Sequence, residues 1–119
     1  IRQHRVSFKH AFHGLWYTFC TQPNLRIHFS IALLVVLAGL YIGISRFEWL
    51  ILLFTFLWVI VSEMVNTSIE ATVDLLAHEY KEQAKVAKDV AAGMVLVGAL
   101  GSVVIGLVVF LPYLPDLIK

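Results

Sequence analysis

The sequence is poor in charge and in the residues that interrupt helices. Of its 119 residues, 14% are charged, three are proline and 60% are apolar. A soluble domain carries about 25% charged residues, so this composition excludes an ordinary soluble protein, as does the mean hydropathy of +0.84. We therefore expect an integral membrane protein in which residues 1–119 form a single domain.

Cysteine and the usual nucleotide-binding motifs are also scarce. Cys20 is the only cysteine, which excludes an internal disulfide and a cysteine-based metal site. The sequence has neither a P-loop nor the glycine-rich loop of protein kinases, so the soluble kinase classes are excluded. Four histidines stand apart from any ligand motif, and we expect interface or surface roles for His10, His13, His28 and His78.

Most of the charged residues lie in two segments. Residues 1–27 carry four basic side chains and no acid. Six of the eight acidic residues fall between positions 63 and 89, together with three lysines. Because no segment resembles a soluble domain, we expect any chemistry to take place at the membrane surface.

Hydrophobic periodicity divides the chain into a surface helix and three spans. Residues 5–20 are too short and too polar to span, so we expect them to lie in the headgroup plane. Their apolar stripe comprises Phe8, Phe12, Leu15, Trp16 and Phe19. Pro23 fits the first turn of a new helix. The expected spans are about residues 27–44, 49–76 and 90–114, which makes the fold class all-α.

The second span has a short apolar run. Only the 13 residues from Trp49 to Val61 are apolar before Ser62, whereas crossing a bilayer takes about 20. The helix must therefore bury its polar extension against protein or emerge into the headgroups near Glu63.

Basic residues set the expected orientation. Residues 1–27 and the loop at 78–88 hold seven of the nine Lys and Arg residues. The positive-inside rule therefore places the N-terminus and this loop in the cytoplasm and the C-terminus outside.

In the third span Gly98, Ser102 and Gly106 recur every four residues, a spacing that lets helices approach closely. We expect a homo-oligomer.

A row of polar residues continues from the second apolar run. Glu63, Asn66, Glu70 and Asp74 are spaced i, i+3, i+7 and i+11, so they share one helix face. A hairpin between the second and third spans would bring this row to the depth of Lys85, Lys88 and Asp89. Carboxylates are the usual Mg²⁺ ligands, and a lysine binds phosphate as a point charge. The grouping predicts a site for a phosphate chelated to a divalent cation.

Two other interpretations of these charges are open. Charged side chains at a helix end can simply extend to the membrane interface or form a solvated face, an explanation that suits Glu79, Glu82 and Lys85 best. A non-enzymatic cation-binding or transport subunit would also carry acids, but it would need them at mid-membrane depth. Here the acids cluster on one side, and the first and third spans have none within their apolar runs.

The row also carries a resemblance. The pattern E-x-x-N-x-x-x-E-x-x-x-D over residues 63–74, followed by Ala-Lys-Asp at 87–89, resembles the prokaryotic diacylglycerol kinase family over nearly the whole chain. Within that family, residues 24–28 and 88–93 are more similar to the undecaprenol kinase branch than to the enterobacterial diacylglycerol kinase branch.

The resemblance implies a homotrimer in the bacterial cytoplasmic membrane, with active sites shared between subunits and no nucleic acid partner. It implies transfer of the ATP γ-phosphate to a lipid alcohol, with undecaprenol favoured and diacylglycerol as the alternative. By position, Glu63 would be the general base and Asn66 would orient it, while Glu70 would bind Mg²⁺. The residues that would hold the nucleotide are Lys88, Asp89, Tyr80, Asp74 and Arg26.

One position departs from the family pattern. Where the family commonly has a second metal-binding glutamate before the first span, this chain has Gln22. An amide oxygen can ligate Mg²⁺, but it is neutral and therefore a weaker ligand than a carboxylate. We expect either a weaker metal ligand here or a metal held by Glu70 and the phosphates. His10 stands where some relatives have an aromatic residue in contact with the nucleotide.

Overall fold

The structure is a computed structural model that describes residues 7–119. Arg2 and the first two residues of the expected surface helix, Arg5 and Val6, lie outside the described residues. In this part of the chain all the regular structure is helical, in agreement with the predicted fold class. The elements are α1 (Phe8–Thr21), α2 (Pro23–Ile42), α3 (Arg46–Leu76), α4 (Glu82–Phe110), the short 3₁₀ helix η1 (Leu111–Tyr113) and α5 (Leu114–Leu117).

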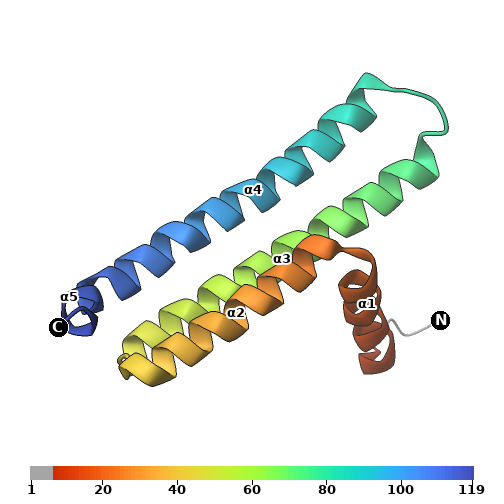
Figure 1. Ribbon diagram of the computed structural model, residues 1–119. Coiled ribbons are helices and arrows are strands. Elements are labelled where there is room, and N and C mark those ends of the chain that lie inside the picture. The colour runs from red at the N-terminus through yellow and green to blue at the C-terminus, as the bar shows by residue number, and fades with distance from the viewer. Residues whose placement is uncertain (1–6) are drawn as a thin grey trace.

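Helix α1 turns away from the long helices at Pro23, as Figure 1 shows. Proline at the first position of α2 has no N–H to lose and a φ suited to a helix start, so the chain changes direction here. A series of aromatic contacts joins α1 to the long helices: Phe19 lies edge-on to Phe29 at 5.5 Å between ring centroids, and Phe29 to Phe56 at 5.2 Å. The apolar residues Phe12 and Trp16 remain exposed on α1, as expected of a helix that lies on a membrane.

The turn between α2 and α3 is fixed by local chemistry. Gly43 ends α2 with a φ of +77°, a left-handed conformation that glycine adopts without steric cost. Ser45 then forms a capping box with Glu48, so α3 begins at Arg46, three residues before the expected span. Next to the turn, a Cβ atom on Gly39 would lie 2.7 Å from the Trp49 ring, so the two helices require glycine to approach this closely.

Helices α3 and α4 form the longest contact of the structure, an antiparallel hairpin seen in Figure 1. Gly98 of α4 packs against Trp58 and Ser62 of α3, where an added Cβ would meet both at 3.5 Å. Gly101 and Gly106 have open space instead. At the opposite end of the hairpin from its loop, the Tyr113 hydroxyl donates a hydrogen bond to Glu48. These contacts hold α3 against α4 at its middle and at its N-terminal end.

Three of the described helices are long and apolar enough to cross a membrane, namely those that begin at Pro23, Arg46 and Glu82. Most of their large apolar side chains are exposed, as lipid-facing side chains are. Helix α3, with 31 residues, is about 46 Å long at 1.5 Å per residue, which exceeds a hydrocarbon core of about 30 Å. One end of α3 therefore leaves the hydrocarbon, and the end with the acidic row is the polar one.

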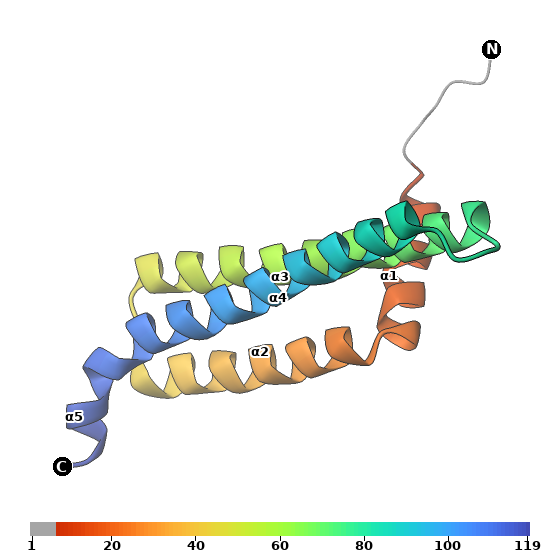
Figure 2. The ribbon, with the colours of Figure 1, turned by 90° about the horizontal axis from the view of Figure 1, so that it is seen from above.

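Figure 1 shows α4 running along α3, and in Figure 2 α4 crosses α3 while α2 lies to one side of it. Helix α3 therefore packs against both other long helices, α2 and α4. Glu63 lies on the face of α3 between these two helices, and Asp74 lies against α4 near the loop.

Candidate active site

The polar row of α3 passes from a buried to an exposed environment along the helix. Glu63 is only 1% exposed and Asn66 only 8%. Glu70, one turn further on, is partly exposed, and Asp74 is exposed. The polar extension of the second apolar run is therefore buried against protein at Glu63 and Asn66 and exposed at Asp74.

His28 of α2 faces Glu63 of α3. Its Nε2 lies 3.8 Å from Glu63 Oε1, and its side chain is 18% exposed. Both residues line a groove of about 350 Å³ that is otherwise mostly apolar. The remaining lining residues are Asn24 and Ile27 of α2 and Ala92, Val95, Leu96 and Ala99 of α4. A buried carboxylate thus stands at a groove open between α2 and α4.

Asn66 joins the buried and partly exposed ends of the row. Its Nδ2 donates a hydrogen bond of 3.2 Å to Glu70 Oε1. Two buried oxygen atoms, Glu63 Oε1 and Asn66 Oδ1, have no hydrogen-bond partner among the described residues. Buried polar atoms are nearly always paired in proteins, so these two oxygens are available to a ligand.

A second cluster lies where the hairpin turns. Lys88 Nζ is 2.5 Å from Asp74 Oδ1, and Lys85 Nζ is 2.5 Å from Asp89 Oδ2. These four residues line a groove of about 360 Å³ with Tyr80, which is 80% exposed. The hairpin therefore brings the end of the polar row to the lysines of α4, at the depth that the spacing predicts.

The two remaining predicted site residues lie near the junction of α1 and α2. The Arg26 guanidinium donates a hydrogen bond of 3.0 Å to the Cys20 carbonyl, so it binds the last turn of α1. Gln22 lies between α1 and α2, and its side chain does not cap α2. Among residues 7–119, no three His, Cys, Asp or Glu side chains are grouped to hold a metal. A metal here would need ligands from amides, phosphates or water.

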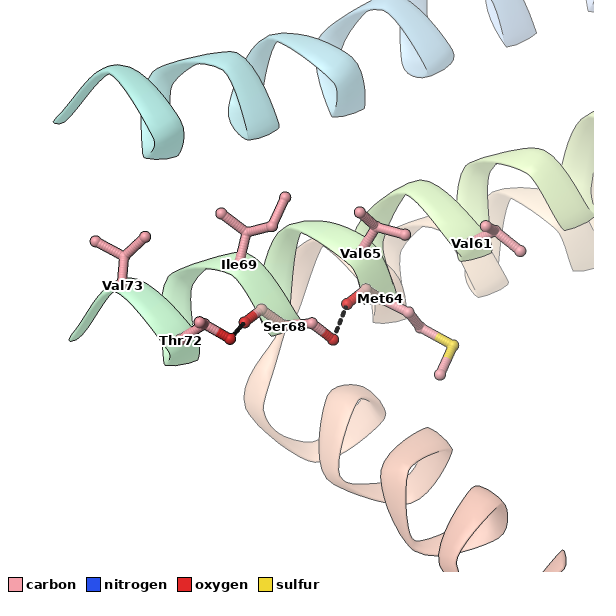
Figure 3. A pocket seen from close by; sticks show the side chains of 7 residues that line it. All are labelled: Val61, Met64, Val65, Ser68, Ile69, Thr72 and Val73. Atoms are coloured by element: carbon pink, nitrogen blue, oxygen red, sulfur yellow. Dashed lines mark hydrogen bonds between the residues drawn. The ribbon is translucent and has the colours of Figure 1, made fainter. Parts of the chain in front are cut away.

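The opposite face of α3 has a different character. A groove of about 500 Å³ lies along this face. Figure 3 shows the side chains that line it, all from α3: Val61, Met64, Val65, Ser68, Ile69, Thr72 and Val73. Its two hydroxyl groups are already satisfied within the helix, since Ser68 donates to the Met64 carbonyl and Thr72 to the Ser68 carbonyl. This face therefore presents mostly apolar surface, in contrast to the face that carries Glu63.

Taken together, fold and site define a multi-pass helical membrane protein with an acidic site at one end of its bundle. The sequence of residues 9–110 matches the prokaryotic diacylglycerol kinase family. The chain belongs to this family, and it is a membrane lipid kinase. This membership decides against the non-enzymatic transport subunit that the sequence left open.

Two relatives are informative. The undecaprenol kinase of Bacillus subtilis is 42% identical over 108 residues, which cover 91% of this chain and 88% of that relative. A diacylglycerol kinase of Synechocystis is 39% identical over 113 residues, which cover 94% of this chain and 65% of that relative. Diacylglycerol kinases of Helicobacter pylori are 29% identical over 101 residues.

The place of His28 is the main point that the sequence reasoning missed, because it treated this histidine as isolated. In the structure it faces Glu63 from a neighbouring helix. One signal was present: His28 is a polar side chain just inside the apolar run that begins at Ile27. Ionisable residues inside a span usually have a partner in the bundle.

Proposed function

We propose that the protein transfers the γ-phosphoryl group of ATP to the hydroxyl of a membrane lipid alcohol in a Mg²⁺-dependent reaction. The observation that carries this proposal is the buried Glu63 carboxylate, which has a free oxygen and opens on an apolar groove. A hydroxyl on an apolar chain is the acceptor that such a groove suits.

Glu63 acts as the general base. In the reaction, the lipid oxygen forms a bond to the γ-phosphorus, the bond from that phosphorus to the β–γ bridging oxygen breaks, and ADP leaves. The hydroxyl proton passes to Glu63. Asn66 fixes the position of the Glu70 carboxylate by donating a hydrogen bond to it. Phosphoryl transfer depends on positioning and electrostatic stabilisation more than on covalent chemistry from the protein, and a few helical side chains can supply these.

The exposed cluster holds the nucleotide. Lys88 carries a positive charge for the phosphates, while Asp74 and Asp89 position the two lysines by the ion pairs described above. Tyr80 lies in the same groove and offers a ring to the adenine. Arg26 supports the site at the α1–α2 junction. The nucleotide must displace these lysines from their carboxylates, which exposed ion pairs permit because they are weak.

Glu70 is the proposed Mg²⁺ ligand, with Gln22 as a second, neutral one. The absence of a larger acidic group among the described residues fits Mg²⁺, which is usually bound by one or two carboxylates together with phosphates and water. The free Asn66 Oδ1 adds an oxygen of the hard type that Mg²⁺ prefers. When bound, the metal would neutralise charge on the phosphates.

The exposed surface and the distribution of charges support a proposal for the assembly and the location. A homotrimer would cover part of the apolar surface of the long helices and place a second subunit beside each site. Small residues of α4, Gly101 and Gly106, have open space for such a neighbour. We place the protein in the bacterial cytoplasmic membrane, with the N-terminus and the α3–α4 loop in the cytoplasm and the C-terminus outside.

Undecaprenol is the preferred lipid in this proposal and diacylglycerol is the alternative. The higher identity to a protein named undecaprenol kinase supports undecaprenol as the first choice. The relatives named diacylglycerol kinase support diacylglycerol as the alternative. The test is to incubate purified protein in mixed micelles with MgATP labelled at the γ-phosphate and either lipid. We expect labelled undecaprenyl phosphate to form faster than phosphatidic acid. If neither lipid is labelled, the proposed reaction is wrong.

A further inference from the structure

We infer that His28 is a positioning residue that holds the acceptor hydroxyl against Glu63. This inference rests on the proposed function, because it assigns the part of the site that receives the lipid. Its structural basis is the approach of a histidine and a buried carboxylate from two different helices at the end of one groove.

The distance between the two side chains leaves room for a third group. His28 Nε2 and Glu63 Oε1 are 3.8 Å apart, whereas a direct N–H···O hydrogen bond has a length of about 2.7–3.2 Å. Glu63 Oε1 is also free of any hydrogen-bond partner among the described residues. A single hydroxyl group beside the pair can contact both atoms, which satisfies the carboxylate oxygen that the fold leaves unpaired.

The groove suits the end of an apolar alcohol. Its α4 side is lined by aliphatic residues, two of which, Ala92 and Ala99, are small enough to leave space. The groove is lined by residues of α2 and α4 on either side of Glu63, and none of the exposed lysines lines it. A hydrocarbon chain can stay among apolar side chains while its hydroxyl reaches the two polar ones.

The roles of the two side chains differ. In the tautomer that carries its proton on Nε2, His28 donates a hydrogen bond to the oxygen of the acceptor and keeps that proton throughout. The hydroxyl proton then points toward Glu63, which accepts it as the oxygen attacks phosphorus. His28 therefore fixes the acceptor, and Glu63 remains the base.

The test compares the variants His28→Leu and His28→Gln with wild type in kinetics that vary lipid and MgATP separately. Leucine fills the space without a hydrogen-bond donor, whereas the glutamine amide restores one. For His28→Leu we expect kcat/KM for the lipid to fall at least about tenfold while KM for MgATP stays unchanged. His28→Gln should recover most of this loss. The matched control is His13→Gln, which changes an exposed histidine of α1 and should behave as wild type.

Three results would overturn the inference. Wild-type lipid kinetics in His28→Leu would show that no contact to the acceptor is lost. An equal loss in His28→Gln and His28→Leu, with both proteins folded, would show that the donor is irrelevant. A matching rise in KM for MgATP would place His28 at the nucleotide instead. If His28→Leu fails to fold, His28→Ala replaces it, and the same outcomes apply. Inactivity of the wild type on every lipid would refute the proposed function, which keeps the two failures distinct.

Discussion

The two polar regions of this molecule are built in opposite ways. The side chains of Glu63 and Asn66 are almost completely buried, and each has an oxygen with no hydrogen-bond partner among residues 7–119. Around Lys88 and Lys85 the side chains are exposed, and every one of the four charges is paired. Burial without a partner costs free energy, whereas exposed ion pairs contribute little to stability.

This difference suggests a division of labour along α3. A dehydrated carboxylate has a fixed position and strong electrostatic interactions, as a base in phosphoryl transfer needs. Exposed lysines can exchange a carboxylate for a phosphate at little cost, as reversible nucleotide binding needs. The buried region is therefore expected to determine the rate of the chemical step and the exposed region the affinity for ATP.

The largest effect is expected from Glu63→Gln. Loss of a general base lowers the rate by about 10²- to 10⁴-fold, so turnover of labelled ATP should nearly stop. The thermal midpoint should not fall, since the neutral amide is less costly to bury than a carboxylate. Glu48→Gln, at the other end of the same helix, is the control and should keep its activity. Wild-type turnover in Glu63→Gln would show that Glu63 is not the general base.

A smaller effect is expected from Lys88→Gln in the exposed region. Loss of a charge-assisted contact to phosphate should raise KM for MgATP about tenfold, measured at saturating lipid, with a modest change in kcat. Lys119→Gln removes a lysine from the far end of the chain and should leave both constants unchanged. If Lys88→Gln lowers kcat as strongly as Glu63→Gln does, the division between the two regions is wrong.

Gln22→Glu tests the departure from the family pattern. A carboxylate is a stronger Mg²⁺ ligand than an amide, so the Mg²⁺ concentration at half-maximal activity should fall about threefold or more. Activity titrated with Mg²⁺ at fixed ATP measures this shift. An unchanged titration curve would mean that residue 22 does not reach the metal.

The smallest effect is expected from Lys85→Ala. This exposed lysine pairs with Asp89 one turn away on the same helix. Such pairs contribute between zero and about 1 kcal/mol, so thermal unfolding should be close to that of wild type. A large loss of stability would show that this pair stabilises α4 more than an exposed ion pair usually does.

The helical fold, the polar row of α3 and its approach to Lys88 could be predicted from the sequence. Three apolar runs and one amphipathic segment were enough for an all-α membrane protein, because backbone groups in lipid must be satisfied within helices. The i, i+3, i+7 and i+11 spacing placed Glu63, Asn66, Glu70 and Asp74 on one face. The hairpin then had to bring Asp74 near Lys88, since both lie close to the same short loop.

Other features depend on how separate helices pack, which no local pattern encodes. The rotation of α2 against α3 decides that His28 rather than Arg26 faces the buried acid. The start of α3 at Arg46 depends on a capping box that continues the helix beyond the apolar run. The assembly and the roles of the site residues remain predictions, as do the membrane boundaries of the spans and the location of the protein.

The most direct test of the division between the two regions is equilibrium binding of MgATP, by calorimetry, to wild type, Glu63→Gln and Lys88→Gln in the same micelles. The account predicts that Glu63→Gln binds MgATP as tightly as wild type although it does not turn over, and that Lys88→Gln binds about tenfold more weakly. Loss of binding in Glu63→Gln together with wild-type binding in Lys88→Gln would contradict it.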